Sequence, residues 1–387
     1  MSTAMEIYQN ERFDADNQLS DSNVVNKYHS AAAIANEAMR RVLEQVQIGR
    51  RVIDICKLGD DYILSTASKM FKKGERGIAR PTCLSINNVV RNYCPCDDDQ
   101  TVLVAGDVVK IELGAHIDGY IATLAHTTVM NPNPQQPITG PTADAICAAY
   151  YASQIALRLI KPGTSSSEVI DAISRVTAAF NCRPVDGTSS FVIKRYLLEG
   201  GNELPNVLDP SNPTEPFTFQ SSEAYSLNIF VSTGTGQLQP SPLRPTIFQR
   251  DVTINYPLKL KSARQLLQTV SHTFGVFPFP LRAALEVDPK FRIGLNECVG
   301  HGVMVPRDVM GDVEGSKVAH FGVTVLVLAS GTMVMTGGEG LSLPYVHSEF
   351  GVETSGLAGL LNNAVRTAKT KVPGETTASG DVNMDLS

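Results

Sequence analysis

Apolar residues recur along the first third of the chain with two different periods, and each period predicts a different element. After the helix-capping sequence Asp21-Ser22-Asn23, apolar residues follow helical spacing from Val25 to Val46. A second helical stretch is predicted over 52–73. The segment 105–130 instead predicts a long β-hairpin, because hydrophobic arms flank the turn signal Asp118-Gly119.

The same order of elements returns further along the chain. A helix is predicted over 143–159, Pro162-Gly163 breaks it, and a second helix follows over 168–180. Strands are predicted over 224–231, 318–329 and 332–336. Both halves therefore run helix, glycine break, then a helix that opens with Val-Ile-Asp, followed by strands. This weak internal duplication predicts two related α/β halves around one sheet.

Three segments depart from this pattern. Residues 1–20 are polar and are predicted to form a disordered N-terminal tail, and residues 364–387 lose apolar periodicity and are predicted to form a disordered C-terminal tail. A single domain is predicted over 21–363. Within it, the mixed segment at about 259–310 predicts a small helical insertion.

Composition narrows the class of protein. The 387 residues are 43% hydrophobic, which is enough for a large core. The sequence contains no run of about 18 apolar residues, so no membrane span is predicted. Seven scattered cysteines are typical of free thiols in a reducing compartment. The net charge of −6 opposes nucleic-acid binding, so any such binding must depend on a local basic patch.

Several motifs resemble a known family. The segments 81–88, 110–119, 223–236 and 319–325 resemble type-2 methionine aminopeptidases. The segments 259–264 and 277–282 are closer to the non-peptidase branch of that family, which includes curved DNA-binding and proliferation-associated, ribosome-binding proteins. The resemblance covers about residues 20 to 360. It implies an α+β pita-bread fold, in which two pseudo-symmetric α/β halves surround a central antiparallel sheet.

The resemblance also implies where a metal site would lie. Active relatives hold two divalent metals with two aspartates, a histidine and two glutamates, and the metals activate a water molecule. In this chain the five positions fall on Glu112, Thr123, Phe191, Asn228 and Gly322. One carboxylate cannot offset two dications. We therefore expect no metal, no cofactor and no catalytic residue, and the alternative is a residual metallo-aminopeptidase with a rearranged site.

Side chains at and around these five positions are the other candidates for a ligand or a substrate contact. A substrate-positioning histidine of the family falls on Asn92. His126 lies three residues from Thr123, and in a regular strand this offset places it on the opposite face. Glu112 is interpreted as a buried, hydrogen-bonded carboxylate, with a residual cation ligand as the alternative. Thr123 and Asn228 are expected to hydrogen-bond each other or Glu112.

Local basic groups are the candidate contacts for a nucleic acid or a ribosome, with a solvated surface as the alternative. The first group is Lys69, Lys72, Lys73, Arg76 and Arg80, and the second is Lys259, Lys261 and Arg264, whose alternation predicts two lysines on one strand face. Lys194 and Arg195 form a third group. By resemblance, the expected partners are ribosomes, structured RNA or curved DNA, with a protein in the old substrate cleft as a further option. A monomer in the cytoplasm, or also in the nucleus, is expected.

Overall fold

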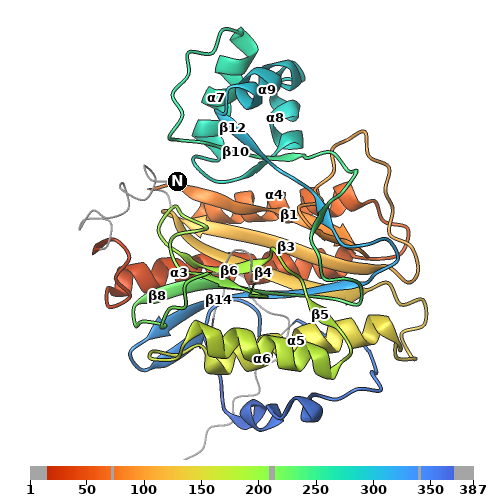
Figure 1. Ribbon diagram of the computed structural model, residues 1–387. Helices are drawn as coiled ribbons and strands as arrows, with labels where there is room; N and C mark the ends of the chain where they lie inside the picture. The colour runs from red at the N-terminus through yellow and green to blue at the C-terminus, as the bar shows by residue number, and fades with distance from the viewer. Residues whose placement is uncertain (1–14, 71–73, 209–213, 339–340, 370–387) are drawn as a thin grey trace, which may run out of the picture.

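The computed structural model describes residues 15–70, 74–208, 214–338 and 341–369. Figure 1 shows a broad twisted sheet covered by long helices, with a small lobe on top of it. No helix among the described residues is long and apolar enough to cross a membrane.

Within the described residues, the broad sheet has ten strands and confirms the predicted central antiparallel sheet. Its main path runs β1-β3-β4-β14-β8-β6-β7, and the strand pairs along it are antiparallel. The strands on this path are β1 (Arg76–Ile86), β3 (Val108–Ile117), β4 (Tyr120–Val129), β14 (Val318–Leu328), β8 (Glu223–Ser232), β6 (Ser189–Ile193) and β7 (Glu203–Pro205). Three strands pair off the path: β5 (Arg183–Pro184), β15 (Gly331–Val334) and β16 (Arg366–Thr367).

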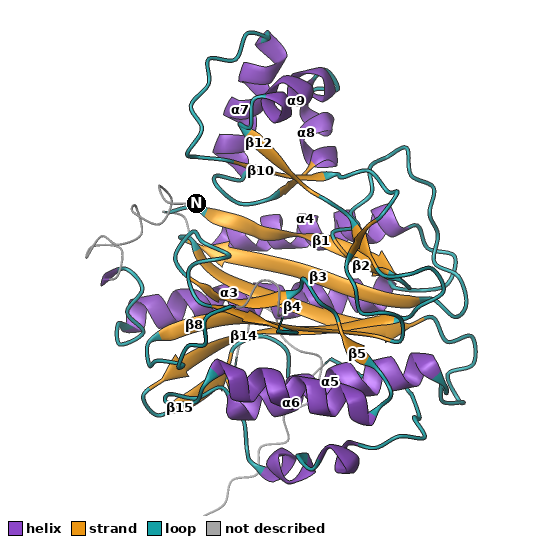
Figure 2. Cartoon of the chain, in the orientation of Figure 1, coloured by secondary structure: helices purple, strands orange, loops and turns teal. Residues whose placement is uncertain are grey.

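Four long helices cover one face of this sheet (Figure 2). They are α3 (Ser22–Gln45), α4 (Val52–Met70), α5 (Pro141–Leu159) and α6 (Ser166–Ala179). α3 and α4 pack on β1, β3 and β4, whereas α5 packs on β8 and β14. Leu124 on β4 pairs with Val323 on β14, so both halves turn the same face of the sheet to their helices. The predicted two-half organisation is therefore confirmed.

Local sequence explains why these elements form. The side chain of Asp21 caps α3 by accepting from Asn23 N at 2.8 Å. Asp118 and Gly119 both have positive φ, +51° and +80°, as the two-residue turn of the β3–β4 hairpin requires. In α5, a row of fully buried alanines lets the helix approach the sheet closely: Ala145, Ala148, Ala149, Ala152 and Ala156.

The lobe on top of the sheet contains the segment that was predicted to be a helical insertion. It contains β10 (Ile247–Arg250), α7 (Lys261–Thr273), β11 (Phe279–Pro280), α8 (Leu281–Val287), α9 (Phe291–Gly300) and β12 (Met304–Arg307). The three strands form a small sheet of their own, in the order β11-β10-β12. The prediction of an insertion at 259–310 therefore has the right helices but misses β10, which begins twelve residues earlier, at Ile247, and is too short to show a period.

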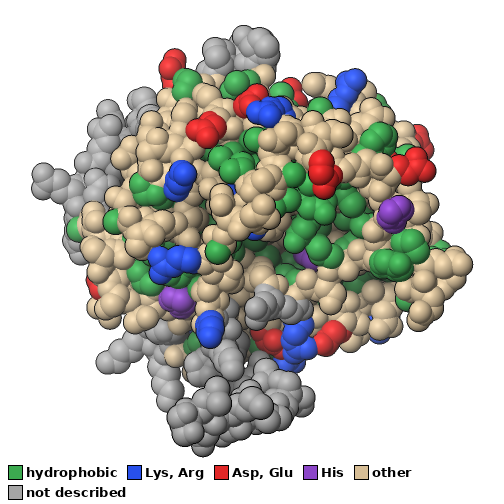
Figure 3. Space-filling view, turned by 90° about the horizontal axis from the view of Figure 1, so that it is seen from below, with side chains coloured by type: hydrophobic (Ala, Val, Ile, Leu, Met, Phe, Trp, Pro, Cys, Tyr) green, Lys and Arg blue, Asp and Glu red, His purple; other side chains and the backbone are tan. Residues whose placement is uncertain are grey.

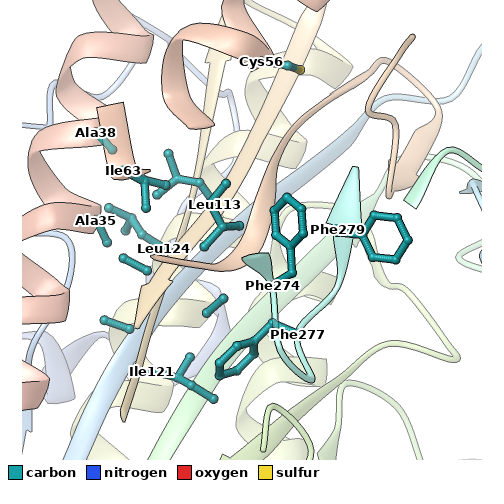
Figure 4. Packing of buried hydrophobic residues seen from close by; sticks show 14 of the residues in the cluster. Ala35, Ala38, Cys56, Ile63, Leu113, Ile121, Leu124, Phe274, Phe277 and Phe279 are labelled. Carbon is teal, nitrogen blue, oxygen red and sulfur yellow. The ribbon is translucent and has the colours of Figure 1, made fainter. Parts of the chain in front are cut away.

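Aromatic residues fasten this lobe to the large sheet. Phe274, Phe277 and Phe279 belong to the same buried cluster as Leu113 and Leu124 of the hairpin. Figure 4 shows the three rings on one side of the hairpin strands, with Ile63 and the alanines of α3 on the other. The sheet is thus covered by helices on one face and, near the hairpin turn, by the lobe on the other.

The remaining short elements are three strands and two 3-10 helices among the described residues. β2 (Val89–Arg91), β9 (Gln239–Pro240) and β13 (Met310–Gly311) form a second small sheet, and two 3-10 helices, η1 (Val352–Ser355) and η2 (Ala358–Asn362), lie below α5 and α6 (Figure 1).

The predicted tails are both too long. Leu19 is buried in the core, and Asp16 bonds to Arg195, so the chain is already packed before residue 20. Near the other end, β16 pairs with β15 after residue 364. Both segments are polar in sequence, and their order depends on partners far along the chain. Residues 1–14 and 370–387 lie outside the described residues.

Candidate functional site

The five positions assigned to family ligands share the face of the sheet that lies opposite the helices. Glu112 pairs with Ala125, Ala125 with Gly322, and Gly322 with Asn228, which makes one row across four strands. Thr123 lies two residues from Ala125 on β4. Phe191 pairs with Ser226, two residues from Asn228. Because side chains two residues apart in a strand share a face, the structure brings all five positions together.

The space above Gly322 is already filled. A Cβ atom added to Gly322 would lie 2.6 Å from Asn228 Oδ1, 3.0 Å from Ala125 Cβ and 3.1 Å from His320 Nε2. His320 Nε2 lies 3.2 Å from Asn228 Oδ1, and its ring stacks on Phe230 with 3.6 Å between centroids. Burial lowers the pKa of His320 well below its usual value, and nearby Arg80, Lys110 and Arg91 lower it further. A neutral His320 therefore donates to Asn228. The sequence-based prediction did not include His320 in the site, although His320 directly follows the apolar residues Val318 and Ala319 in a predicted strand.

Neutral hydroxyl and amide groups bond to one another beside this histidine. Thr123 Oγ1 lies 2.7 Å from Ser226 Oγ and 3.3 Å from Thr324 Oγ1. Asn228 Nδ2 donates to Ser226 Oγ at 3.0 Å. The expected direct bond between Thr123 and Asn228 is therefore wrong, because Ser226 stands between them. Neither residue bonds to Glu112; their role in the described structure is the structural one that was expected.

Glu112 has an internal cation as its partner. Arg80 Nη1 lies 2.8 Å from Glu112 Oε1, and the Glu112 side chain is 10% exposed. Glu112 is thus the buried, bonded carboxylate that was expected. Arg80 pairs with Gly114 and so faces the cleft. Arg80 thus points into the cleft, apart from the other residues of its predicted basic group, and its contact with a nucleic acid or a ribosome stays a prediction.

The residues at the five former ligand positions do not fit two divalent metals. Among the described residues no group of three His, Cys, Asp or Glu side chains is arranged to hold a metal ion. In the row itself, the one carboxylate already neutralises a guanidinium. Further dications at this place would face Arg80 without enough acidic ligands to offset their charge.

His126 lies on the other face, as predicted. Its ring packs edge-on against Phe321 at 5.4 Å, and its Nε2 lies 3.2 Å from Ser342 O. Burial lowers the pKa of His126 to about 4. His126 therefore cannot take the place of a lost ligand in the cleft.

A cavity of about 350 Å³ opens beside the row, between the large sheet and the insertion. Arg80, Arg91 and Phe191 line it from strands of the main body, and Arg307 lines it from β12 of the insertion. Asn92, which has a φ of +69°, also lines it and donates to Asp308 O at 2.8 Å. The cavity therefore occupies the place of the substrate cleft that the resemblance implies.

The structure separates the predicted basic groups. Lys69 lies in the last turn of α4, and Arg76, which donates to Gly74 O at 3.1 Å, begins β1. Lys72 and Lys73 lie outside the described residues. The second group is at the start of α7, whereas Gly275, just after the end of that helix, lies near Glu75. The second group therefore lies at the opposite end of α7 from Glu75, and a 13-residue helix is about 20 Å long.

The second group has a different local structure from the one predicted. Lys259 is in a loop and Lys261 begins α7, so the prediction that both lysines share a strand face is wrong. Glu297 on α9 accepts from Lys259 N and Leu260 N at 2.6 and 2.9 Å, and so holds the segment just before α7 against α9. Arg264 Nη1 donates to Lys259 O at 2.6 Å. All three basic side chains are exposed.

The third basic group has a structural role in part. Arg195 bonds to Asp118 Oδ1 at 2.7 Å and to Asp16 Oδ2 at 2.9 Å, and so ties the hairpin turn to the N-terminal segment. Elsewhere charges are mixed. On the face seen from below in Figure 3, Lys and Arg side chains stand singly among acidic and apolar ones.

Comparisons with known proteins agree with this geometry. Residues 26–205 match metallopeptidase family M24. The chain is 38% identical over 370 residues to proliferation-associated protein A of Dictyostelium discoideum, covering 95% of each protein. It is 34% identical over 366 residues to the curved DNA-binding protein of Schizosaccharomyces pombe, covering 92% of this chain and 94% of the relative. Among solved structures, a thermophilic Arx1 superposes with a TM-score of 0.82 at 26% identity, covering 89% of this chain and 99% of the other.

Proposed function

The chain belongs to metallopeptidase family M24, and from this premise we propose that it is a non-peptidase member that binds ribosomes or nucleic acid. The observation that carries the first half of the proposal is the row of former ligand positions. These positions meet on one face of the sheet. Glu112, however, forms an ion pair with Arg80, and the side chains of Asn228 and His320 occupy the space next to Gly322. Peptide hydrolysis in this family needs an activated, metal-bound water.

Metal content and cleavage test this half of the proposal. Protein purified in the presence of Mn²⁺ or Co²⁺ and then desalted is expected to carry less than a stoichiometric amount of metal, and to leave a Met-Ala-Ser tripeptide uncleaved. The Glu112→Gln variant serves as the matched control for any trace activity. Stoichiometric metal, with cleavage that Glu112→Gln abolishes, would instead establish the residual peptidase.

The second half of the proposal rests on relatives and on exposed charge. One relative is named for binding curved DNA, and the segments at 259–264 and 277–282 resemble the branch that includes ribosome-binding proteins. Lys259, Lys261 and Arg264 are exposed at one end of α7, on the insertion that projects from the main body (Figure 1). With a net charge of −6, affinity must come from such local contacts with phosphates, and salt must weaken it. We place the protein as a monomer in the cytoplasm or nucleus.

Ribosome co-sedimentation over a salt series tests this half. We expect binding at 50 mM KCl that falls at least tenfold by 200 mM, because each phosphate contact releases counterions. The double variant Lys259→Glu with Lys261→Glu is expected to bind more weakly and to show a shallower salt dependence. Arg50→Glu with Lys161→Glu changes the net charge equally at exposed positions elsewhere and serves as the control. Equal loss in both variants, or binding insensitive to salt, would contradict a contact through α7.

A further inference from the structure

Basic and acidic side chains line the cleft cavity in equal number, three of each, and the acids are Glu199, Glu203 and Asp308. Three arginines line it: Arg80, Arg91 and Arg307. Arg80 is bound to Glu112 at 2.8 Å. Arg307 contacts Gln249 Oε1 through Nε at 3.2 Å and lies 3.4 Å from Glu199 Oε1. Each of these two arginines therefore already has an acceptor within the chain.

Arg91 differs from both. Its Nε atom is buried and has no hydrogen-bond partner among the described residues. A buried donor without an acceptor costs about 1–3 kcal/mol, so such groups usually mark a missing partner. Burial lowers the pKa of Arg91, Glu112 favours its charged form and Arg80 opposes it. The Arg91 guanidinium thus lies in the field of two acids, Glu112 and Glu199, and of two other arginines, Arg80 and Arg307.

The site is built into two rigid elements. Arg91 ends β2 and pairs with Met310 on β13, so strand pairing holds the backbone that carries it on one side. Asn92, the next residue, fixes the exit of this strand through its bond to Asp308 O. The arginine is therefore positioned before any ligand arrives, which lowers the entropy cost of binding.

We propose that this cavity binds the carboxylate of an extended peptide segment, with Arg91 as its main contact. Arginine pairs with planar carboxylates through two parallel hydrogen bonds, and Arg91 lines the cavity. Phosphates in a nucleic-acid strand fit less well, because Glu199, Glu203 and Asp308 also line the cavity and would repel a chain of negative charges. The same acidic groups can accept from peptide N–H groups. A cavity of about 350 Å³ suits a short segment.

The carboxylate has two possible sources, a chain terminus or an Asp or Glu side chain, and the probes must separate them. Titration calorimetry on the full-length protein would use acetyl-Gly-Gly-Gly with a free carboxylate, the same peptide as its amide, acetyl-Gly-Asp-Gly amide, and a ten-nucleotide oligouridylate. We expect one of the two carboxylate peptides to bind at least tenfold more tightly than the neutral amide, and which of them does so identifies the source. Equal binding of all three peptides, no binding of any, or preference for the oligouridylate would overturn the proposal.

Two variants tie the binding to this cavity. Arg91→Gln is expected to weaken the carboxylate peptide at least tenfold, with Arg50→Gln at an exposed position as the control. Glu112→Gln is expected to tighten binding severalfold, because it frees Arg80 from its internal partner. A gain in affinity cannot result from misfolding, so this variant keeps the test valid if Arg91→Gln unfolds. An unchanged or weaker affinity in Glu112→Gln would overturn the role of the two arginines. The proposal is independent of ribosome binding through α7.

Discussion

At the scale of single residues, the cleft is shaped by the uncharged residues at four of the five former ligand positions. Gly322 removes a side chain, and Asn228 and His320 occupy the space that a carboxylate would need. The remaining acid, Glu112, pairs with Arg80 and so leaves little net charge for a cation. The absence of a side chain at one position and the presence of a ring at another act together, which is why single reversions are not expected to restore a metal site.

Gly322→Glu tests this directly. The new Cβ would lie 2.6 Å from Asn228 Oδ1, and the carboxylate would be buried without a cationic partner placed for it. We expect a loss of roughly 3 kcal/mol or more in the free energy of unfolding, measured by urea denaturation. Mn²⁺ is not expected to restore stability.

Gly359→Glu is the matched control, because a Cβ at Gly359 meets nothing within 4 Å. Stabilisation of Gly322→Glu by Mn²⁺ would show that the positions still form a metal site.

At the scale of elements, the turn of the β3–β4 hairpin acts as an anchor. Asp118 accepts from Lys27 Nζ of α3 at 2.6 Å and from Arg195 Nη2 at 2.7 Å. Although burial alone would raise it, these hydrogen bonds hold the pKa of Asp118 below its usual value. The turn therefore joins the first helix and the segment after β6 to the edge of the sheet.

Asp118→Asn is expected to cost about 1 kcal/mol in the free energy of unfolding, since the ion pairs are partly exposed. Asp118→Ala is expected to cost about 1 kcal/mol more, because alanine tolerates a φ of +51° less well than asparagine. Both values come from urea denaturation. Asp61→Asn at an exposed position is the control, and equal stability of the Asn and Ala variants would contradict the argument from φ.

At the scale of the whole molecule, three buried histidines set a limit on acid stability. Burial lowers the pKa of His116 to about 3 and that of His126 to about 4, and it lowers that of His320 well below its usual value. In the unfolded chain these rings take up protons near pH 6.5. In the folded protein His116 and His126 stay largely neutral until about pH 4, and the pKa of His320 is likewise well below its usual value. The unfolded state therefore binds more protons in this window, and stability falls as the pH falls from 6.5 to 4.

We expect the free energy of unfolding to fall by several kcal/mol across this window, on the order of 1 kcal/mol per pH unit for each histidine. Urea denaturation at half-unit pH steps measures the slope. His126→Gln is expected to make the slope shallower by up to one proton, whereas the exposed His272→Gln serves as the control. A slope that is the same in His126→Gln and in the unaltered protein would contradict the assignment of neutral buried rings.

The elements with long, regular periods were predicted from the sequence alone. The hairpin around Asp118 and the helices α3, α5 and α6 show their own hydrophobic repeat, and their turns and caps are local in sequence. The loss of charged ligands was also visible, because residue identity alone decides whether a side chain can hold a metal. The alternation rule placed His126 on the far face for the same reason.

The tertiary structure decided which side chains from distant segments become partners. Arg80 pairs with Glu112 across two neighbouring strands, and His320 meets Asn228 although the two residues are far apart in the chain. Lys259 and Lys261 alternate like a strand, but Lys261 begins α7, and Glu297 on another helix holds the backbone of Lys259 and Leu260 just before it. The order of residues 15–20 likewise depends on Arg195 and the core. A one-dimensional pattern reports which face a side chain takes, whereas partners and cavities arise only when distant segments fold against one another.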